Sequence, residues 1–524
     1  FGSRLFCAPR TRRNACLGSL DPDIGPVVTA MAEADIYATY TRLAETFKTG
    51  RTKSYEWRFA QISNIRRMLT ENLSAVEQAI KADLGRPKAE AMTAEVFATV
   101  GEIDYALKHL KEWMAPEAKP TPLLQKPGRS VVIREPKGLI LDLAPWNFPI
   151  NLSLSTMVGI ISAGNCCVLK PSEVSPKCEQ FLKEYIPRYC DPDAIAVVTG
   201  GVAESQLLLK LRWDHIVYTG NSHVAKEILA AAAQNLTPCT LELGGKSPTV
   251  VLPGANVPVA ARRILAGKCM NAGQICIAPD YALVHEAVAE ALEAELKKSM
   301  QAWYGDDAQQ SASFGRIINQ RHFQRVKGLV ESAGVAEVYQ QGRMDEASKF
   351  IPPTLIKNPG EDSDIMKDEI FGPVLPFITC RSLDEIVERI NSKEKPLALY
   401  IFGREADADE IIRQTSSGGV CVNDTIFHIA TPELPFGGVG NSGMGSYHGK
   451  WGFDEFSHKR SVMYRATWAD PSLRYPPYTD GTVRLLEKVM VGPLLPEGAA
   501  RRLLSAGAAL GAAGVWLAVR RSRL

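Results

Sequence analysis

The spacing of hydrophobic positions changes along the chain and separates a helical first part from an α/β body. Between residues 36 and 114, apolar side chains return every three or four positions among many charges, as in residues 58–69. This spacing predicts long amphipathic helices. After Gly138 the pattern changes to short apolar runs separated by helix-length segments, at residues 139–143, 166–169, 195–198 and 216–218. Alternating strands and helices predict a parallel sheet covered by helices, as in nucleotide-binding folds.

A second block with the same alternation extends from Thr249 to about Phe436, where Gly and Pro become frequent. Neither a tandem repeat nor a low-complexity linker separates it from the first block. Two interlocked α/β domains are therefore expected, in preference to independent modules joined by a linker.

The first thirty residues differ in composition from this body. They contain several arginines and no acidic residue before Asp21, whereas Met31 begins a segment that resembles a natural start. Residues 1–30 are interpreted either as a transit-like extension or as a segment joined upstream of Met31.

Residues 503–519, near the other end of the chain, form an uncharged run with arginines on both sides. As a helix rising ~1.5 Å per residue it spans roughly 25 Å, slightly less than a bilayer core. Because it is rich in Ala and Gly, a buried terminal helix or coil is the alternative. The run has no polar stripe and follows a complete folded body, so residues 501–524 are expected to be a membrane tail anchor. Residues 467–500 then form a C-terminal extension.

Composition and charge narrow the classes of function. The 524 residues, 45% of them apolar, can build several large cores. The 60 basic residues nearly balance the 58 acidic ones and form no basic stripe, so no nucleic acid partner is expected. Eleven cysteines, an odd number without C-x-x-C pairs, favour reduced thiols over a disulfide framework or a zinc site. No metal site is predicted.

Cys276 and Glu242 carry the candidate chemistry. Cys276 follows Gly273-Gln274-Ile275, and Glu242 precedes Leu243-Gly244-Gly245. A thiolate attacks carbonyl carbons and a carboxylate can activate water, so this pair can form a thioester and then hydrolyse it. A single cysteine is usually a small buried hydrophobe, and that interpretation is kept for the other cysteines. The adjacent glycines indicate a close backbone approach that an ordinary surface Glu does not need.

Several motifs occur in the order in which aldehyde dehydrogenases carry them. They are Pro145-Trp146-Asn147-Phe148-Pro149, Lys170-Pro171-Ser172-Glu173, Tyr218-Thr219-Gly220-Asn221, Glu242-Leu243-Gly244-Gly245-Lys246-Ser247-Pro248, Gly273-Gln274-Ile275-Cys276 and Glu369-Ile370-Phe371-Gly372-Pro373. Over about residues 36 to 465 the chain resembles that family. Gly85-Arg86-Pro87-Lys88 and residues 102–110 resemble its class 3 branch, which includes membrane-bound fatty aldehyde dehydrogenases. The resemblance implies oxidation of aliphatic or aromatic aldehydes, above all medium- or long-chain aliphatic ones, to carboxylic acids.

The resemblance also implies a role for each catalytic residue. Cys276 attacks the aldehyde, and the side-chain amide of Asn147 stabilises the oxyanion together with the backbone N–H of Cys276. The thiohemiacetal then expels hydride, which no side chain accepts, so a nicotinamide cofactor is required. Glu242 is expected to activate water for thioester hydrolysis, and Glu369 is the alternative base.

Cofactor binding is expected to depart from the common pattern, because no Gly-x-Gly-x-x-Gly follows the first strand. Instead, Gly220, Asn221 and Ser222 begin a helix whose N-terminus would face the pyrophosphate, and the family's second glycine position holds Ala225. A carboxylate at Glu173, near Lys170, favours the ribose 2′-hydroxyl of NAD over the 2′-phosphate of NADP, although NADP remains an alternative cofactor. Trp146, Gly245, Glu369 and Phe371 complete the expected cofactor contacts.

The expected α/β architecture combines a Rossmann-like NAD-binding domain, an α/β catalytic domain and a β oligomerisation arm. Their ranges are residues 31–118 with 135–243, residues 244–453, and residues 119–134 with 454–466. The arm would pair across a homodimer, and the tail would hold the protein at a membrane with its catalytic body facing the cytosol. Two other functions stay open, a non-catalytic binding relative and a cysteine acyltransferase that passes the acyl group to a thiol.

Overall fold

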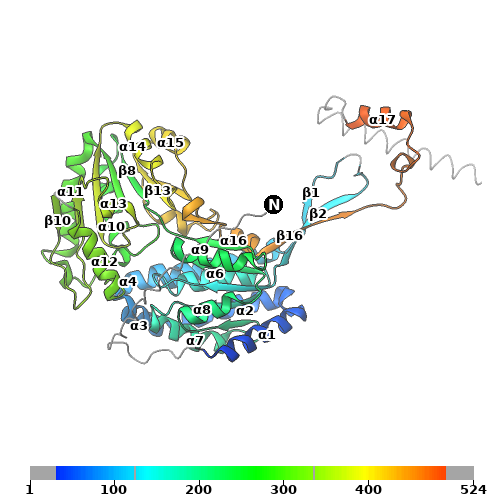
Figure 1. The fold of residues 1–524 in the computed structure, drawn as a ribbon, viewed down its shortest axis with the longest axis horizontal. Coiled ribbons are helices and arrows are strands. Elements are labelled where there is room, and N and C mark those ends of the chain that lie inside the picture. The colour runs from blue at the N-terminus through cyan, green and yellow to red at the C-terminus, as the bar shows by residue number, and fades with distance from the viewer. Residues whose placement is uncertain (1–30, 123–124, 334–336, 491–524) are drawn as a thin grey trace, which may run out of the picture. The chain divides into compact units, whose positions relative to one another are not determined.

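The computed structural model describes residues 31–122, 125–333 and 337–490, which Figure 1 shows as a ribbon. One compact unit holds most of the chain up to Ser461, except for Ala118–Val131, which group with Val462 and the residues after it in a second unit. The expected leader, residues 1–30, and the expected tail anchor, residues 501–524, lie outside the described residues. No helix within the described part is long and apolar enough to cross a membrane.

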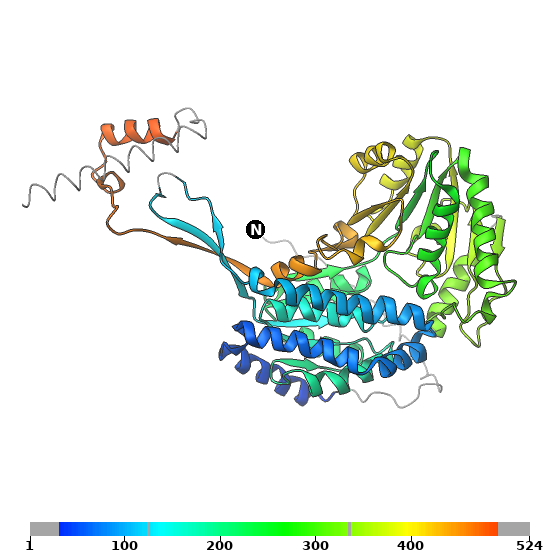
Figure 2. The same cartoon turned by 180° about the vertical axis from the view of Figure 1, so that it is seen from behind.

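The first part of the chain is helical, as its sequence period predicts. Its helices are α1 (Glu33–Lys48), α2 (Tyr55–Glu71), α3 (Leu73–Leu84), α4 (Lys88–Ala91) and α5 (Ala98–Trp113), with a π-helical turn at Met92–Phe97. Each long helix buries one apolar stripe; in α2 this stripe includes Ile62, Ile65 and Leu69. Helices α2 and α5 lie side by side (Figure 2).

The first sheet has the strand order β15-β7-β6-β3-β4-β5. Its strands are β3 (Leu139–Leu143), β4 (Cys166–Lys170), β5 (Ile195–Val197), β6 (His215–Thr219), β7 (Cys239–Glu242) and β15 (Gly443–Met444). Strands β3 to β7 are parallel, and β15 pairs with β7 in the antiparallel sense. The connecting helices are α6 (Asn151–Ser162), α7 (Pro176–Tyr189), α8 (Val202–Leu209) and α9 (Ser222–Ala233). This confirms the predicted α/β fold class.

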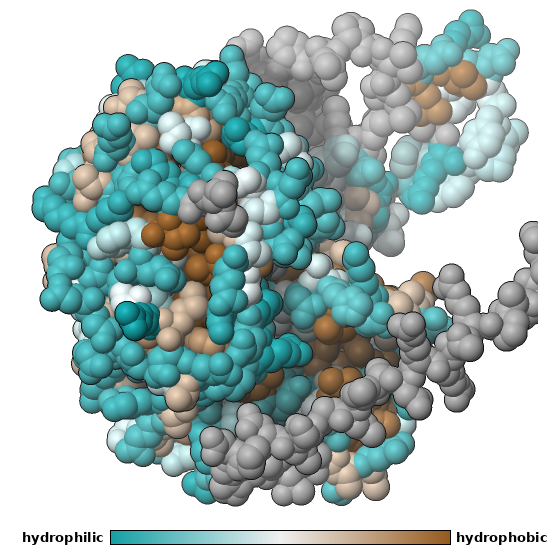
Figure 3. Space-filling model, turned by 60° about the vertical axis from the view of Figure 1, so that its left-hand side comes forward, coloured by the Kyte–Doolittle hydropathy of each residue, from teal (hydrophilic) through white to brown (hydrophobic). Residues whose placement is uncertain are grey.

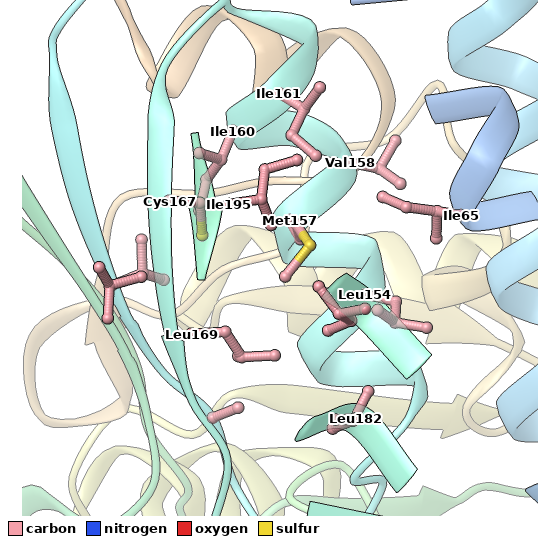
Figure 4. Close-up of a cluster of buried hydrophobic side chains, with 14 of the residues drawn as sticks. Ile65, Leu154, Met157, Val158, Ile160, Ile161, Cys167, Leu169, Leu182 and Ile195 are labelled. Atoms are coloured by element: carbon pink, nitrogen blue, oxygen red, sulfur yellow. The ribbon is translucent and has the colours of Figure 1, made fainter. Parts of the chain in front are cut away.

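Helix α6 lies at the centre of the first core, because all its residues are buried. Figure 4 shows Leu154 and Met157 of α6 in one cluster with Ile65 of α2, Cys167 of β4 and Leu182 of α7. Contacts on every side fix the helix and with it the loop before its first turn. That loop carries Trp146 and Asn147.

The second sheet has the order β10-β11-β12-β9-β8-β13-β14. Its strands are β8 (Pro248–Val251), β9 (Tyr281–His285), β10 (Glu337–Gln340), β11 (Thr354–Lys357), β12 (Val374–Cys380), β13 (Ala398–Phe402) and β14 (Gly419–Val422). Its helices are α10 (Val257–Cys269), α11 (Glu286–Tyr304), α12 (Gln320–Glu331), α13 (Asp364–Lys367), α14 (Leu383–Asn391) and α15 (Glu405–Gln414). Helix α16 (Gly449–Glu455) packs against α5 and α6 of the first core. Helices α14 and α15 lie together on one side of this half (Figure 1). Its outer face is mostly hydrophilic, with small hydrophobic patches (Figure 3).

A third sheet of order β1-β2-β16 contains the segments predicted to form the arm. Its strands are β1 (Glu117–Lys119), β2 (Arg129–Pro136) and β16 (Ser457–Tyr464), and α17 (Asp480–Met490) follows further along the chain. Pairing of this sheet across a dimer stays a prediction. So do the expected limits of the NAD-binding and catalytic domains, since both ranges fall almost entirely in the larger compact unit.

Candidate active site

Cys276 lies in the loop between α10 and β9 and is partly buried. Just before it, Asn271, Ala272 and Gly273 have φ values of 50°, 50° and 75°, which lie in the left-handed region. Gln274 holds this turn, because its amide nitrogen donates to Asn271 O (2.9 Å) and Arg316 O (3.0 Å). Its amide oxygen accepts from Ile318 N (2.9 Å). The nucleophile therefore follows a strained but firmly held loop.

The thiol of Cys276 is not activated by its surroundings alone. Burial and the carboxyl groups of Glu369 and Glu242 raise its pKa, and the backbone N–H groups of Cys276 and Ile277 lower it by less. The thiol is therefore protonated at neutral pH. A base must take its proton before or during attack on an aldehyde.

Asn147 lies beside the Cys276 loop and is buried. Its side-chain nitrogen donates to Gln274 O at 3.1 Å, two residues before Cys276. A primary amide has two N–H donors, so one can anchor the side chain while the second serves an oxyanion. The structure thus brings two of the predicted catalytic residues to one place.

Glu242 ends β7, and its backbone is fixed on both sides. Gly220 N donates to Glu242 O (3.0 Å), and Gly443 of β15 pairs with Glu242. The carboxyl group is buried, and neither oxygen has a hydrogen-bond partner among the described residues. Burial, and next the negative charge of Glu455, raise the pKa of Glu242 well above its ordinary value. Burial therefore favours the protonated form of this carboxyl, and no hydrogen bond from the described residues holds it in place.

Glu369 belongs to a loop that several buried charges hold. Lys246 Nζ pairs with Asp280 Oδ2 (2.5 Å) and donates to Asp368 O (2.9 Å), while Asp280 Oδ1 accepts from Ile370 N (2.9 Å). A Cβ added at Gly244 would overlap Glu369 Oε2, which explains the glycine beside the carboxyl. Burial and Asp280 raise the pKa of Glu369 to about 8, so this group can exchange protons near neutral pH.

Trp146 and Phe371 form an aromatic pair next to these groups. Their ring centroids are 5.4 Å apart in an edge-to-face arrangement, and His322 lies 5.1 Å from Trp146 on another side. Phe371 has a φ of 48°, which is rare for a bulky residue and is typical of a functional position. That these two rings hold the nicotinamide stays a prediction.

The residues predicted to hold the adenosine end lie at the carboxyl edge of the first sheet. Lys170 ends β4 and pairs with Glu173 (Nζ to Oε2, 3.1 Å), whose side chain is 45% exposed. Gly201 faces this carboxylate, since a Cβ added there would lie 3.8 Å from Glu173 Oε1. A charged pair at this edge, with a glycine opposite, fits a ribose.

Helix α9 begins at the same edge. Asn221 caps it by accepting from Val224 N (2.9 Å), and Ser222 in the first turn is exposed. An open helix N-terminus fits a pyrophosphate. Ala225 is 2% exposed and packs with Leu241 and Leu243, so its methyl group belongs to the core beneath the helix, and its expected contact with the cofactor stays a prediction. Gly245 packs against the backbone of Pro396.

Sequence reasoning missed the residues that hold the catalytic loops together. Arg86, Glu95 and Asn271 form a buried polar group beside Asn147. The motif Gly85-Arg86-Pro87-Lys88 is the sequence signal that could have pointed to them, because Arg is rarely buried without a partner.

Comparison with known proteins places this site in a family. The aldehyde dehydrogenase family model matches residues 21–462. The dimeric NADP-preferring aldehyde dehydrogenase of Rattus norvegicus is 45% identical over 447 residues, which are 85% of this chain and 98% of the rat protein. Aldehyde dehydrogenase family 3 member I1, chloroplastic, of Arabidopsis thaliana is 40% identical over 487 residues, 92% of this chain and 88% of the plant protein.

A solved structure shares both fold and sequence with the chain. The substrate-bound AldH of Staphylococcus aureus matches with a TM-score of 0.84 and 40% identity, over 87% of this chain and 99% of that protein. The fold, the order of the motifs and these likenesses agree. The chain belongs to the aldehyde dehydrogenase family, with relatives in its class 3 branch, and is an NAD(P)-dependent enzyme that oxidises aldehydes.

Proposed function

We propose that the enzyme converts medium- or long-chain aliphatic aldehydes into carboxylic acids through a thioester on Cys276. One contact supports this mechanism most directly, the hydrogen bond from Asn147 Nδ2 to Gln274 O (3.1 Å). It keeps a side-chain amide next to the loop of the nucleophile. A carbonyl oxygen that gains negative charge during attack then meets a donor already in place.

In the first step Cys276 loses its proton and its sulfur attacks the carbonyl carbon. The buried carboxyls of Glu369 and Glu242 are the neighbouring bases, and each can take this proton once it is ionised. Asn147 and the backbone N–H of Cys276 stabilise the oxyanion. The bound nicotinamide supplies the hydride acceptor that the protein lacks.

In the second step water attacks the thioester, and Glu242 is the main base that activates it. Its carboxyl has no hydrogen-bond partner among the described residues, so its side chain can turn toward the thioester without breaking a hydrogen bond. A water-activating base at this position favours hydrolysis over transfer of the acyl group to a thiol. Glu369 is the second candidate, because its pKa of about 8 suits a general base.

The preferred cofactor is NAD, and NADP is also used. Glu173 would accept hydrogen bonds from the ribose hydroxyls and repel a 2′-phosphate, whereas Lys170 would attract one. With Lys170 Nζ 3.1 Å from Glu173 Oε2, the pair would allow either NAD or NADP to bind. The rat relative is named NADP-preferring, which supports use of NADP as well.

The enzyme acts as a homodimer attached to a membrane through residues 501–524, with its catalytic body in the cytosol. Strand β16 is an edge of its sheet and is mostly exposed, so its free edge can pair with a second copy. The uncharged run at 503–519 supports the membrane attachment. Long-chain aldehydes partition into the same lipid phase, since each methylene favours it by ~0.8 kcal/mol.

A series of aldehydes of rising chain length tests this substrate class. With NAD or NADP in excess, we expect kcat/KM to rise by up to about fourfold per methylene until the binding site is filled, the limit set by ~0.8 kcal/mol. The product should be the free acid, identified by mass spectrometry in the presence and absence of an added thiol. A flat or falling series would instead assign a general aldehyde dehydrogenase, and an acyl thioester product would assign an acyltransferase.

A further inference from the structure

Arg86 is one of the most deeply buried charged residues of the described part, with 1% of its surface exposed. Each of its three nitrogens donates to a different group. Nη1 donates to Glu95 Oε1 (2.7 Å), Nε to Asn271 Oδ1 (3.1 Å), and Nη2 to the backbone oxygen of Asn147. The guanidinium also lies 4.4 Å from the ring centroid of Phe148. Burying a charge is costly unless it is fully paired, and here every nitrogen of the charged group has a partner.

The three acceptors belong to the two loops that form the catalytic site and to the first helical part. Asn147 carries the oxyanion donor. Asn271 begins the turn that leads to Cys276, and its Nδ2 donates to Asn147 O (2.9 Å) and to Gln274 O (3.1 Å). Arg86 and Asn271 thus hold the same carbonyl group from two sides. The planar guanidinium fixes the distance between the two loops, which a flexible ammonium group would not.

Glu95 connects this group to the core. Its Oε2 accepts from Ile150 N (3.1 Å) and Asn151 N (2.7 Å), the backbone donors at the start of α6. The carboxylate therefore caps the central helix while it orients the arginine. Neither residue touches the position of a reacting atom.

We propose that Arg86, oriented by Glu95, is a positioning residue that sets the oxyanion-stabilising amide of Asn147 against the Cys276 loop. This inference rests on the proposed roles of Asn147 and Cys276. Displacing a catalytic group by 1 Å can cost about 100-fold in rate. Loss of Arg86 should therefore lower the rate of attack on the aldehyde and leave cofactor binding unchanged.

The test uses the full-length enzyme with two variants of the pair. Arg86→Met removes all three donors but leaves Glu95 buried without its partner, which can destabilise the fold. The double variant Arg86→Met/Glu95→Gln avoids this, because the neutral amide introduced at position 95 keeps an oxygen that accepts from Ile150 N and Asn151 N. We expect the double variant to melt close to wild type and to lose about 100-fold in kcat. KM for the aldehyde and Kd for NAD should stay within about threefold.

Arg58 provides a matched control. It is also buried, at 4% exposed, and donates to the backbone oxygens of Thr52, Lys53 and Ser162, away from the site. Arg58→Met should lower the melting temperature but keep kcat per folded molecule. A loss of kcat equal to that of the Arg86 variants would mean that any buried arginine matters, and would refute the proposal.

A double-mutant cycle with Asn147→Ala separates positioning from general damage. If Arg86 acts through Asn147, adding the Arg86 change to Asn147→Ala should lower kcat by less than about threefold more. If the losses of kcat caused by the Arg86 change and by Asn147→Ala multiply in the combined variant, the proposal is overturned. A kcat close to wild type in Arg86→Met/Glu95→Gln would also overturn it. Normal kcat in Asn147→Ala alone would instead reject the proposed oxyanion role. Should both Met variants fail to fold, Arg86→Lys replaces them in the cycle, with the same non-additivity expected.

Discussion

The carboxyl group of Glu242 is buried without a hydrogen-bond partner among the described residues, and this makes it a clean position for substitution. Gln keeps the shape of this side chain but cannot accept a proton from water. We expect Glu242→Gln to keep the burst of NADH, because Cys276 still forms the thioester. Steady turnover should then fall by about 100-fold. Stopped-flow measurement of NADH gives both phases.

Glu369→Gln is the control for Glu242→Gln, and it is tested by the pH dependence of steady turnover. A carboxyl whose pKa is raised to about 8 is protonated below that pH and accepts a proton only above it. If Glu369 is the deacylation base, steady turnover of wild type should rise as pH passes through about 8, and Glu369→Gln should abolish that rise. If Glu369→Gln loses this rise and Glu242→Gln turns over at the wild-type steady rate, Glu369 is the deacylation base in place of Glu242.

At the scale of elements, the proposed choice of cofactor depends on the turn between β4 and α7. Glu173→Gln removes the charge that repels a 2′-phosphate while Lys170 remains. We expect the ratio of kcat/KM for NADP to that for NAD to rise roughly tenfold, the equivalent of about 1.4 kcal/mol. Steady-state kinetics with each cofactor measures the ratio.

Glu184 on α7 serves as the comparison. Its side chain is 44% exposed and lies 3.7 Å from Arg188, so it resembles Glu173 in exposure and in having a basic neighbour. Glu184→Gln should leave the ratio unchanged. An unchanged ratio in Glu173→Gln as well would place the adenosine ribose elsewhere.

The strands and helices that position the site were largely predictable, because their apolar periods are local properties of the sequence. The strand predicted at 216–218 in fact begins at His215. The imidazole ring of His215 is buried, and its Nε2 is hydrogen-bonded to Thr240 Oγ1 (2.7 Å). Hydropathy does not indicate that a polar residue begins the buried strand. Motifs singled out Cys276, Asn147 and Glu242 as candidate catalytic residues. They did not identify Arg86 or Glu95, whose value depends on contacts with distant segments.

For the molecule as a whole, the predicted tail links location to substrate. Deleting residues 501–524 should release the protein from membranes, because the uncharged run would be lost. Activity on short aldehydes should persist, since the catalytic motifs end at Pro373. Flotation on liposomes and an assay with a short aldehyde check both parts. Dimerisation should also persist, because β16 ends at Tyr464.

A charge placed in a tail of full length tests whether the apolar character of the tail, and not its length, attaches the protein to membranes. Leu510→Arg keeps the length of the tail but places a charge near the middle of the run, at a cost of roughly 2.5–3.5 kcal/mol for insertion. It should reduce liposome binding as the deletion does. If liposome binding is unchanged in both the deletion and Leu510→Arg, residues 501–524 do not attach the enzyme to membranes.

The contacts that orient Asn147 join segments that lie far apart in the chain. Arg86 and Asn271 are 185 residues apart in the chain, and Asn147 and Gln274 are 127 apart. Contacts between such distant segments form late and slowly. We expect a nascent or partly refolded chain to have its thiol before the amide of Asn147 is oriented. We therefore expect reactivity toward aldehydes to appear during refolding only after these long-range contacts have formed.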